Sequence, residues 1–273
     1  MPQYGSPSRR VVLGAITTAL APAAFAQTAP VAIPALASAF APTGRLRAVI
    51  NFGNPVLARR SASGEPSGVS VDLARRLAER LGLPLELVPV EAAGRAVETV
   101  RNGLGDIGFF AVDPVRSEGI QFSPPYVQIV GSYLVREGSP FTANDQVDRP
   151  GTRIAVGLAS AYDLFLTREI KAATLVRIPT SPRVVDGFLE QGLDVAAGVR
   201  QQLEADMRRL PGLRLLPGQF MVINQAMGMP ANRDPAAHQF LFDLVEEAKA
   251  SGFIAAALAR HGVEGASVAP PGR

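Results

Sequence analysis

Two successive rounds of alternating strand and helix patterns constrain the fold of this chain most. The first round begins with a strand at 45–51 and ends with a strand at 106–112, and the second runs from 152 to 199. Strands joined by crossover helices form parallel sheets with helices on their faces. Each round is too short for a complete enzyme, so the 273 residues predict an α/β protein of two lobes with a cleft between them.

The clearest helix pattern lies in the first round. Apolar residues recur every four positions from Val69 to Leu81, while charged residues occupy the opposite face. Ser70 is the predicted N-cap, and Gly82 ends the helix. A later helix, capped by Asp234, has no following strands of its own and must pack on one of the lobes.

The N-terminus is typical of an export signal. Arg9 and Arg10 precede an apolar run that is too short to span a membrane, and a small-residue cleavage site ends at Ala26. We therefore predict a signal peptide at 1–26 that resembles the twin-arginine type, with general secretory export as the alternative. Residues 27–44 contain three prolines and no sustained period, which predicts a flexible Ala/Pro-rich leader.

Charge and cysteine content exclude several classes of protein. The formal net charge is +3, and removal of the two signal arginines leaves +1, so neither nucleic acid nor a membrane surface is an expected partner. The absence of cysteine excludes disulfides, Cys metal sites and a lipidated anchor. His238 and His261 have no matching carboxylate pattern, so no metal or cofactor is expected. We expect a monomer that diffuses freely in the periplasm.

Four motifs in order carry a family resemblance: GVSVDLARRLAERLG (68–82), GDIGF (105–109), Arg116 and FSPPY (122–126). Together they resemble the family 3 periplasmic solute-binding proteins, the polar amino acid receptors of ABC importers. The resemblance implies the type II periplasmic-binding-protein fold with two hinge crossovers. It places lobe 1 at 45–130 and 222–264, lobe 2 at 131–221 and a tail at 265–273. The predicted hinge residues are Val127, Leu134, Val222 and Gln225.

The resemblance also implies a binding site. Arg116 matches the family arginine that grips the ligand carboxylate, for which a planar guanidinium offers two parallel donors. Ser160 and Ala161 match the helix N-terminus that donates backbone N–H groups to the same carboxylate. Asn51, Asn54 and Ala111 are the further ligand-binding residues that we predict.

One position departs from the pattern of amino-acid-binding members. In those members an aspartate holds the ligand ammonium, and Arg200 aligns with that aspartate here. If this alignment is shifted, Asp194 is the acidic residue that would take the position instead. Asn51 stands where an acidic residue often ends the first strand. An arginine facing Arg116 would repel an ammonium and favour a dicarboxylate.

These features predict a binding protein, not an enzyme, that delivers a small anionic metabolite to an ABC permease. An enzyme that resembles cyclohexadienyl dehydratase would share the scaffold, but it needs a general acid in the cleft and no acidic residue stands in a motif position. An amino acid-binding receptor, or the sensory lobe of a signalling receptor, would also share the scaffold.

Overall fold

The structure is a computed structural model that describes residues 1–3 and 33–272. The predicted signal sequence, with Arg9, Arg10 and the cleavage after Ala26, lies outside the described residues, as does the start of the predicted leader. Among the helices that the structure describes, none is both long and apolar enough to cross a membrane.

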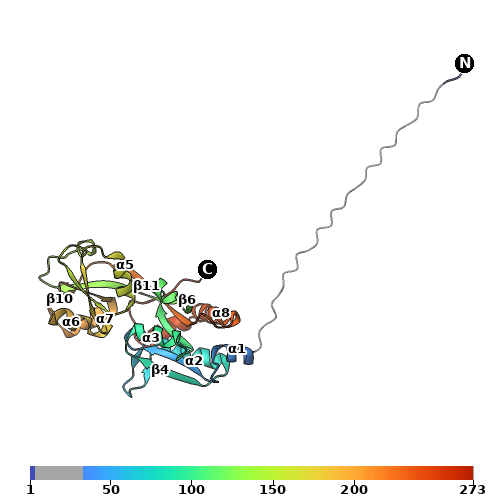
Figure 1. Ribbon diagram of the computed structural model, residues 1–273, viewed down its shortest axis with the longest axis horizontal. Helices are drawn as coiled ribbons and strands as arrows, with labels where there is room; N and C mark the ends of the chain where they lie inside the picture. The colour runs from blue at the N-terminus through green and yellow to red at the C-terminus, as the bar shows by residue number, and fades with distance from the viewer. Residues whose placement is uncertain (4–32, 273) are drawn as a thin grey trace. The chain divides into compact units, whose positions relative to one another are not determined.

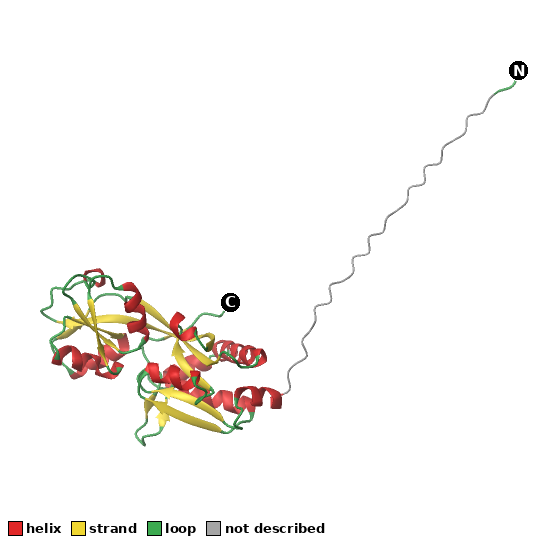
Figure 2. Ribbon diagram, in the orientation of Figure 1, coloured by secondary structure: helices red, strands yellow, loops and turns green. Residues whose placement is uncertain are grey.

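One ten-stranded mixed sheet runs through the described residues 33–272, with helices packed on both of its faces (Figures 1 and 2). Its strand order is β4-β1-β5-β11-β6-β9-β7-β8, and β10 and β12 pair with β6 outside this path. The strands are β1 (Leu46–Asn51), β4 (Leu85–Val90), β5 (Ile107–Ala111), β6 (Ile120–Arg136), β7 (Arg153–Gly157), β8 (Thr174–Ile178), β9 (Val195–Val199), β10 (Leu213–Leu215), β11 (Met221–Pro230) and β12 (Ser267–Val268). A separate hairpin pairs β2 (Arg59–Arg60) with β3 (Pro66–Ser67).

Lobe 1 is built on the parallel strands β4, β1 and β5, with β11 antiparallel to β5. Side chains alternate between the two faces of these strands. The helices of lobe 1 are α1 (Ile33–Phe40), α2 (Val69–Leu81), α3 (Ala93–Arg101), α4 (Pro114–Ser117), α8 (Pro235–Ala250) and α9 (Phe253–Arg260). Ala48 and Ile50 join the core under α2, α8 and α9, whereas Val49 packs with α3 on the other face.

Lobe 2 repeats this plan on the parallel strands β9, β7 and β8. The helices of lobe 2 are α5 (Ala161–Glu169), α6 (Val184–Glu190) and α7 (Arg200–Arg209), and two 3₁₀ turns lie at Asn144–Gln146 and Ser181–Arg183. Ile154 and Val156 pack with α5, and Ala155 between them packs with α6 and α7 on the opposite face. The alternation explains why short apolar strands can be buried on both faces.

Two strands connect the lobes, as the type II fold requires. The 17-residue β6 pairs with β11 through its first part and with β9 and β10 through its last part. The predicted hinge residues Val127 and Leu134 lie in β6, and Val222 and Gln225 lie in β11. Val127 and Gln225 face each other in the register, which shifts directly after Gln225.

Three local predictions are wrong. Residues 33–44 are not a flexible leader, because Ile33–Phe40 form helix α1, whose Phe40 is fully buried and packs edge-on against Phe240 at 5.9 Å. Residues 265–273 are not a plain tail, because β12 pairs with β6. Ser70 does not cap α2; the N-cap is Gly68, and Ser70 is buried inside the first turn.

Candidate functional site

Arg116 is presented by a short turn of helix that follows β5. Asp113 caps this turn, because its Oδ1 accepts from the backbone N–H of Val115 at 2.9 Å, and Pro114 occupies the first helical position. The sequence Asp-Pro-Val-Arg thereby encodes α4 locally. The turn directs the Arg116 side chain inward, where the residue is only 4% exposed.

The buried guanidinium of Arg116 binds two backbone carbonyl groups. Nη1 donates to Ala111 O at 3.1 Å within lobe 1, and Nη2 donates to Ala159 O at 2.9 Å in lobe 2. Burial lowers the pKa of Arg116 to about 10, against the opposing effect of the nearby Asp113 charge. The group therefore remains protonated at neutral pH. Its two bonded acceptors are neutral and the nearby Asp113 carboxylate is paired with Arg168, so the positive charge of Arg116 favours a further anion.

The facing wall of the site is the start of helix α5. Ser160 is its N-cap, with Oγ accepting from the Asp163 N–H at 3.1 Å. Ser160, Ala161 and Tyr162 all line the cavity. The first N–H groups of a helix have no acceptor within the helix, and its dipole favours negative charge there. Burial raises the pKa of Tyr162 above its ordinary value, so the phenol keeps its proton.

The loop before α5 has an unusual backbone. Ala159 has φ 56° and is the only non-glycine residue between 33 and 272 with a positive φ. Its N–H donates to Asp163 Oδ2 at 2.8 Å, and its carbonyl oxygen accepts from Arg116. Strained residues of this kind gather at functional sites. Here the strained residue is itself a partner of the predicted ligand-binding arginine.

Lobe 1 supplies the remaining polar wall at the end of β1. Asn51 Oδ1 accepts from the Gly53 N–H at 2.9 Å and so stabilises the turn. A Cβ on Gly53 would lie 2.9 Å from both Asn51 Oδ1 and Glu91 O, so this approach requires glycine. Asn54 contributes a buried Oδ1 without a hydrogen-bond partner in the described structure.

These residues line a partly open cavity of about 40 Å³, which we call the Arg116 pocket. One water needs about 10 to 15 Å³ on this measure, so the space suits a few waters, and a solute of several heavy atoms requires the lobes to part. Among the described residues that line the pocket, Arg116 is the only charged one. The lining residues are Asn51, Gly53, Asn54, Ala93, Phe109, Phe110, Ala111, Arg116, Ser160, Ala161, Tyr162, Ser181, Val199, Ile223 and Gln225.

The structure brings six of the seven predicted ligand-binding residues together at this pocket. The exception is Arg200. Strand β9 ends at Val199, which lines the pocket, and Arg200 begins α7 with its side chain turned to lobe 2 itself. Its guanidinium donates to Gly218 O and lies 3.9 Å from Glu204. The prediction that Arg200 faces Arg116 is therefore wrong, and among the described lining residues no second cation selects a dicarboxylate.

Several lining residues were missed from the sequence. Gln225 was predicted only as a hinge residue, and Tyr162 and Ser181 were not predicted. Tyr162 lies two residues after the cap Ser160, so the predicted helix N-terminus could have identified it as a lining residue. Ser181 comes from a separate loop, and no local pattern places that loop beside α5.

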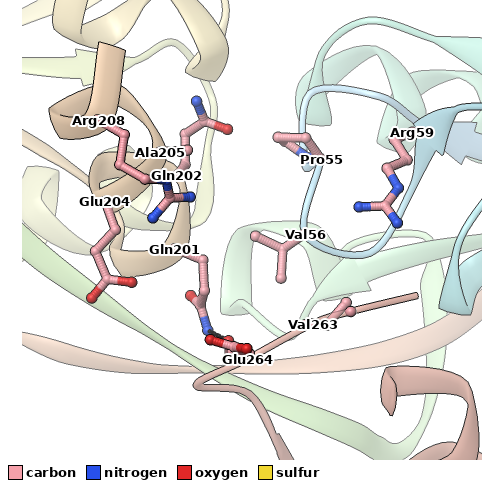
Figure 3. Close-up of a pocket in the computed structure, with 11 residues that line it drawn as sticks. Pro55, Val56, Arg59, Gln201, Gln202, Glu204, Ala205, Arg208, Val263 and Glu264 are labelled. Carbon is pink, nitrogen blue, oxygen red and sulfur yellow. Dashed lines mark hydrogen bonds between the residues drawn. The ribbon is translucent and has the colours of Figure 1, made fainter. Parts of the chain in front are cut away.

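Two further cavities lie near the Arg116 pocket. A narrow one shares Gly53, Asn54 and Tyr162 with it and reaches the buried Asp206, whose carboxylate already binds Arg209 at 2.8 Å and Gln202 at 3.1 Å. The other, of about 250 Å³, lies between α7 and the segments 55–59 and 262–264 (Figure 3). Figure 3 shows Arg208 on the α7 side and Arg59 opposite it. None of the predicted ligand-binding residues lines this outer cavity.

The fold and the Arg116 pocket define a two-lobed α/β binding protein with a cation in its cleft. Residues 47–264 match the model of the bacterial extracellular solute-binding proteins, family 3. The chain belongs to that family, as the sequence motifs predicted.

Similar structures share the fold at low identity. A mutant of ArgBP from T. maritima is 19% identical, with 84% of this chain and all of that chain covered at a TM-score of 0.72. An ancestral amino acid-binding protein, described as a precursor of cyclohexadienyl dehydratase, is 18% identical, with 80% and 95% covered at a TM-score of 0.67. The membrane-bound lytic murein transglycosylase F of Idiomarina loihiensis is 33% identical over 101 residues, which is 36% of this chain and 22% of that enzyme.

Proposed function

We propose that this protein captures a small organic acid and delivers it to an ABC importer, working in the periplasm after loss of residues 1–26. The acid carries one carboxylate on a neutral, hydrogen-bonding body. The observation that carries the proposal is Arg116, a buried guanidinium at the wall of a pocket whose other described lining residues are uncharged.

Charge is the physical basis of this proposal. Burial of a cation is unfavourable unless an anion accompanies it. The carbonyl groups of Ala111 and Ala159 satisfy part of the hydrogen-bonding capacity of Arg116 but bring no negative charge. A carboxylate bound there would neutralise the guanidinium and also accept from the N-terminus of α5. Both interactions strengthen when closure expels water.

The rest of the pocket favours a neutral body over an ammonium. Asn51, Asn54 and Gln225 bring amide groups, and Ser181 and Tyr162 bring hydroxyl groups. An ammonium among them would be desolvated without a carboxylate partner. Asp206 lines only the adjoining narrow cavity and is already paired with Arg209. Asp113 and Asp163 lie beside the pocket without lining it, and they are paired with Arg168 and Arg177.

An amino acid receptor is the second candidate. It is favoured by the family and by the amino acid-binding protein among the structural neighbours. An acid beside the pocket, such as Asp206, would then exchange its arginine partner for the ligand ammonium. An enzyme is less favoured, because a dehydratase needs a general acid and no described lining residue of the Arg116 pocket is acidic.

Matched ligand pairs test the proposal. We would titrate the mature protein calorimetrically with lactate against alanine, 2-oxoisocaproate against leucine, and succinate against aspartate, after a thermal-shift screen. A ligand at 100 times its Kd adds about 2.7 kcal/mol, which raises the melting temperature of a chain of this size by about 5 to 10 °C. We expect the acid without an ammonium to bind more tightly in each pair. Tight binding confined to α-amino acids would establish the second candidate instead.

A further inference from the structure

Asp113 contacts both lobes although it belongs to lobe 1. Its Oδ1 caps α4, and its Oδ2 accepts from Arg168 Nη2 of lobe 2 at 2.9 Å. The Asp113 side chain is 5% exposed and that of Arg168 is 40% exposed. A nearly buried carboxylate thus has its only described side-chain ion partner on the other lobe.

Helices α4 and α5 form the two walls of the Arg116 pocket, and the same two helices hold the two members of this ion pair. Helix α4 holds Arg116, with Asp113 as its cap, and helix α5 begins at the pocket and holds Arg168 in its last turn. The Arg116 to Ala159 hydrogen bond joins the elements at the pocket, and the Asp113 to Arg168 pair joins them away from it. Arg168 itself does not line the pocket.

We propose that Arg168 is a positioning residue that holds the closed arrangement of the two lobes through Asp113. When the lobes part, the pair must separate, because its members lie on different lobes. The pair then contributes to the closed-to-open ratio and leaves the stability of each lobe largely unchanged. The effect on solute affinity rests on the proposed function, whereas the effect on closure does not.

The expected size follows from the burial of Asp113. Exposed ion pairs contribute little, but a pair with one buried carboxylate contributes more, because loss of the partner leaves that carboxylate desolvated. We expect loss of Arg168 to lower the closed-to-open ratio about tenfold, which is about 1.4 kcal/mol.

The test measures the distance between the lobes without any solute. The chain has no cysteine, so Ala62→Cys in lobe 1 and Gln191→Cys in lobe 2, both exposed, provide two unique sites for spin labels. Double electron–electron resonance then reports the closed and open populations for the parent, Arg168→Met, Asp113→Asn and the double variant. Asparagine keeps the N-cap of α4. We expect each single substitution to raise the open population and the double variant to match the singles.

Arg209→Met is the matched control. Arg209 lies 2.8 Å from the buried Asp206 with side-chain exposures of 49% and 5%, but this pair is wholly within lobe 2. The Arg209→Met substitution should leave the distance distribution unchanged. Arg168→Lys should retain part of the closed population that Arg168→Met loses. An unchanged distribution in Arg168→Met, or strictly additive effects of the two single substitutions, would overturn the proposal. Because no solute is added, this result is independent of whether an organic acid binds.

Discussion

Ala159→Gly tests whether the loop that faces Arg116 stores backbone strain. Ala159 adopts φ 56°, in the left-handed region. That conformation costs an L-residue about 1 to 2 kcal/mol, and glycine does not incur the cost. Glycine in turn makes the unfolded chain more flexible, which removes about 0.4 to 1 kcal/mol of stability. Taken at the middle of each range, the difference is a net stabilisation of about 0.5 to 1 kcal/mol.

Thermal unfolding measures this difference. For a domain of this size, 1 kcal/mol corresponds to about 2 to 4 °C, so Ala159→Gly should melt about 1 to 4 °C higher than the parent. The control is Ala161→Gly, two residues on, in the first turn of α5. There the backbone is helical, and glycine should lower the stability by up to about 1 kcal/mol. A melting temperature for Ala159→Gly at or below that of the control would refute the presence of strain.

Three other substitutions test the pocket and the revised N-terminal boundary. Arg116→Met should weaken binding of the best acid by at least thirtyfold, from a loss of about 2 to 5 kcal/mol, in calorimetric titration; binding within a few-fold of the parent would remove Arg116 from the site. Gly53→Ala places a Cβ 2.9 Å from Asn51 Oδ1 and Glu91 O, so it should weaken acid binding, whereas the control Gly138→Ala, at an open position without a positive φ, should leave binding unchanged. Phe40→Ala should lower the unfolding free energy by about 3 to 5 kcal/mol in urea titration, whereas a value under about 1 kcal/mol would return residues 33–40 to a dispensable leader.

The two-lobed fold was predictable because it depends on periodicity. Ile154 and Val156 face one core and Ala155 the other, so the strand forms an unbroken apolar run of the kind that parallel sheets require. Arg116 was predictable for a different reason. Its position in the turn follows from the local Asp113-Pro114 cap, which involves only neighbouring residues.

The errors arose where long-range packing decides the structure. Residues 33–40 resemble a leader because Pro34 and the alanines hide an amphipathic pattern of only Leu36 and Phe40. Their burial depends on Phe240, which lies 200 positions later in the chain. No local propensity reports such a contact.

The position of Arg200, one residue beyond the lining residue Val199, changes the predicted chemistry of the site. A strand that ends at Val199 directs that side chain into the pocket, and the next residue opens a helix whose side chains turn away from it. At this strand-to-helix junction, a difference of a single residue thus separates an apolar wall of the pocket from a second cation. With Val199 in place, Arg116 is the one charge among the described lining residues, and a single carboxylate suffices to neutralise it. Arg168 and Asp113 form an ion pair between the lobes and do not line the pocket. In our proposal this pair stabilises the closed arrangement and does not select the solute.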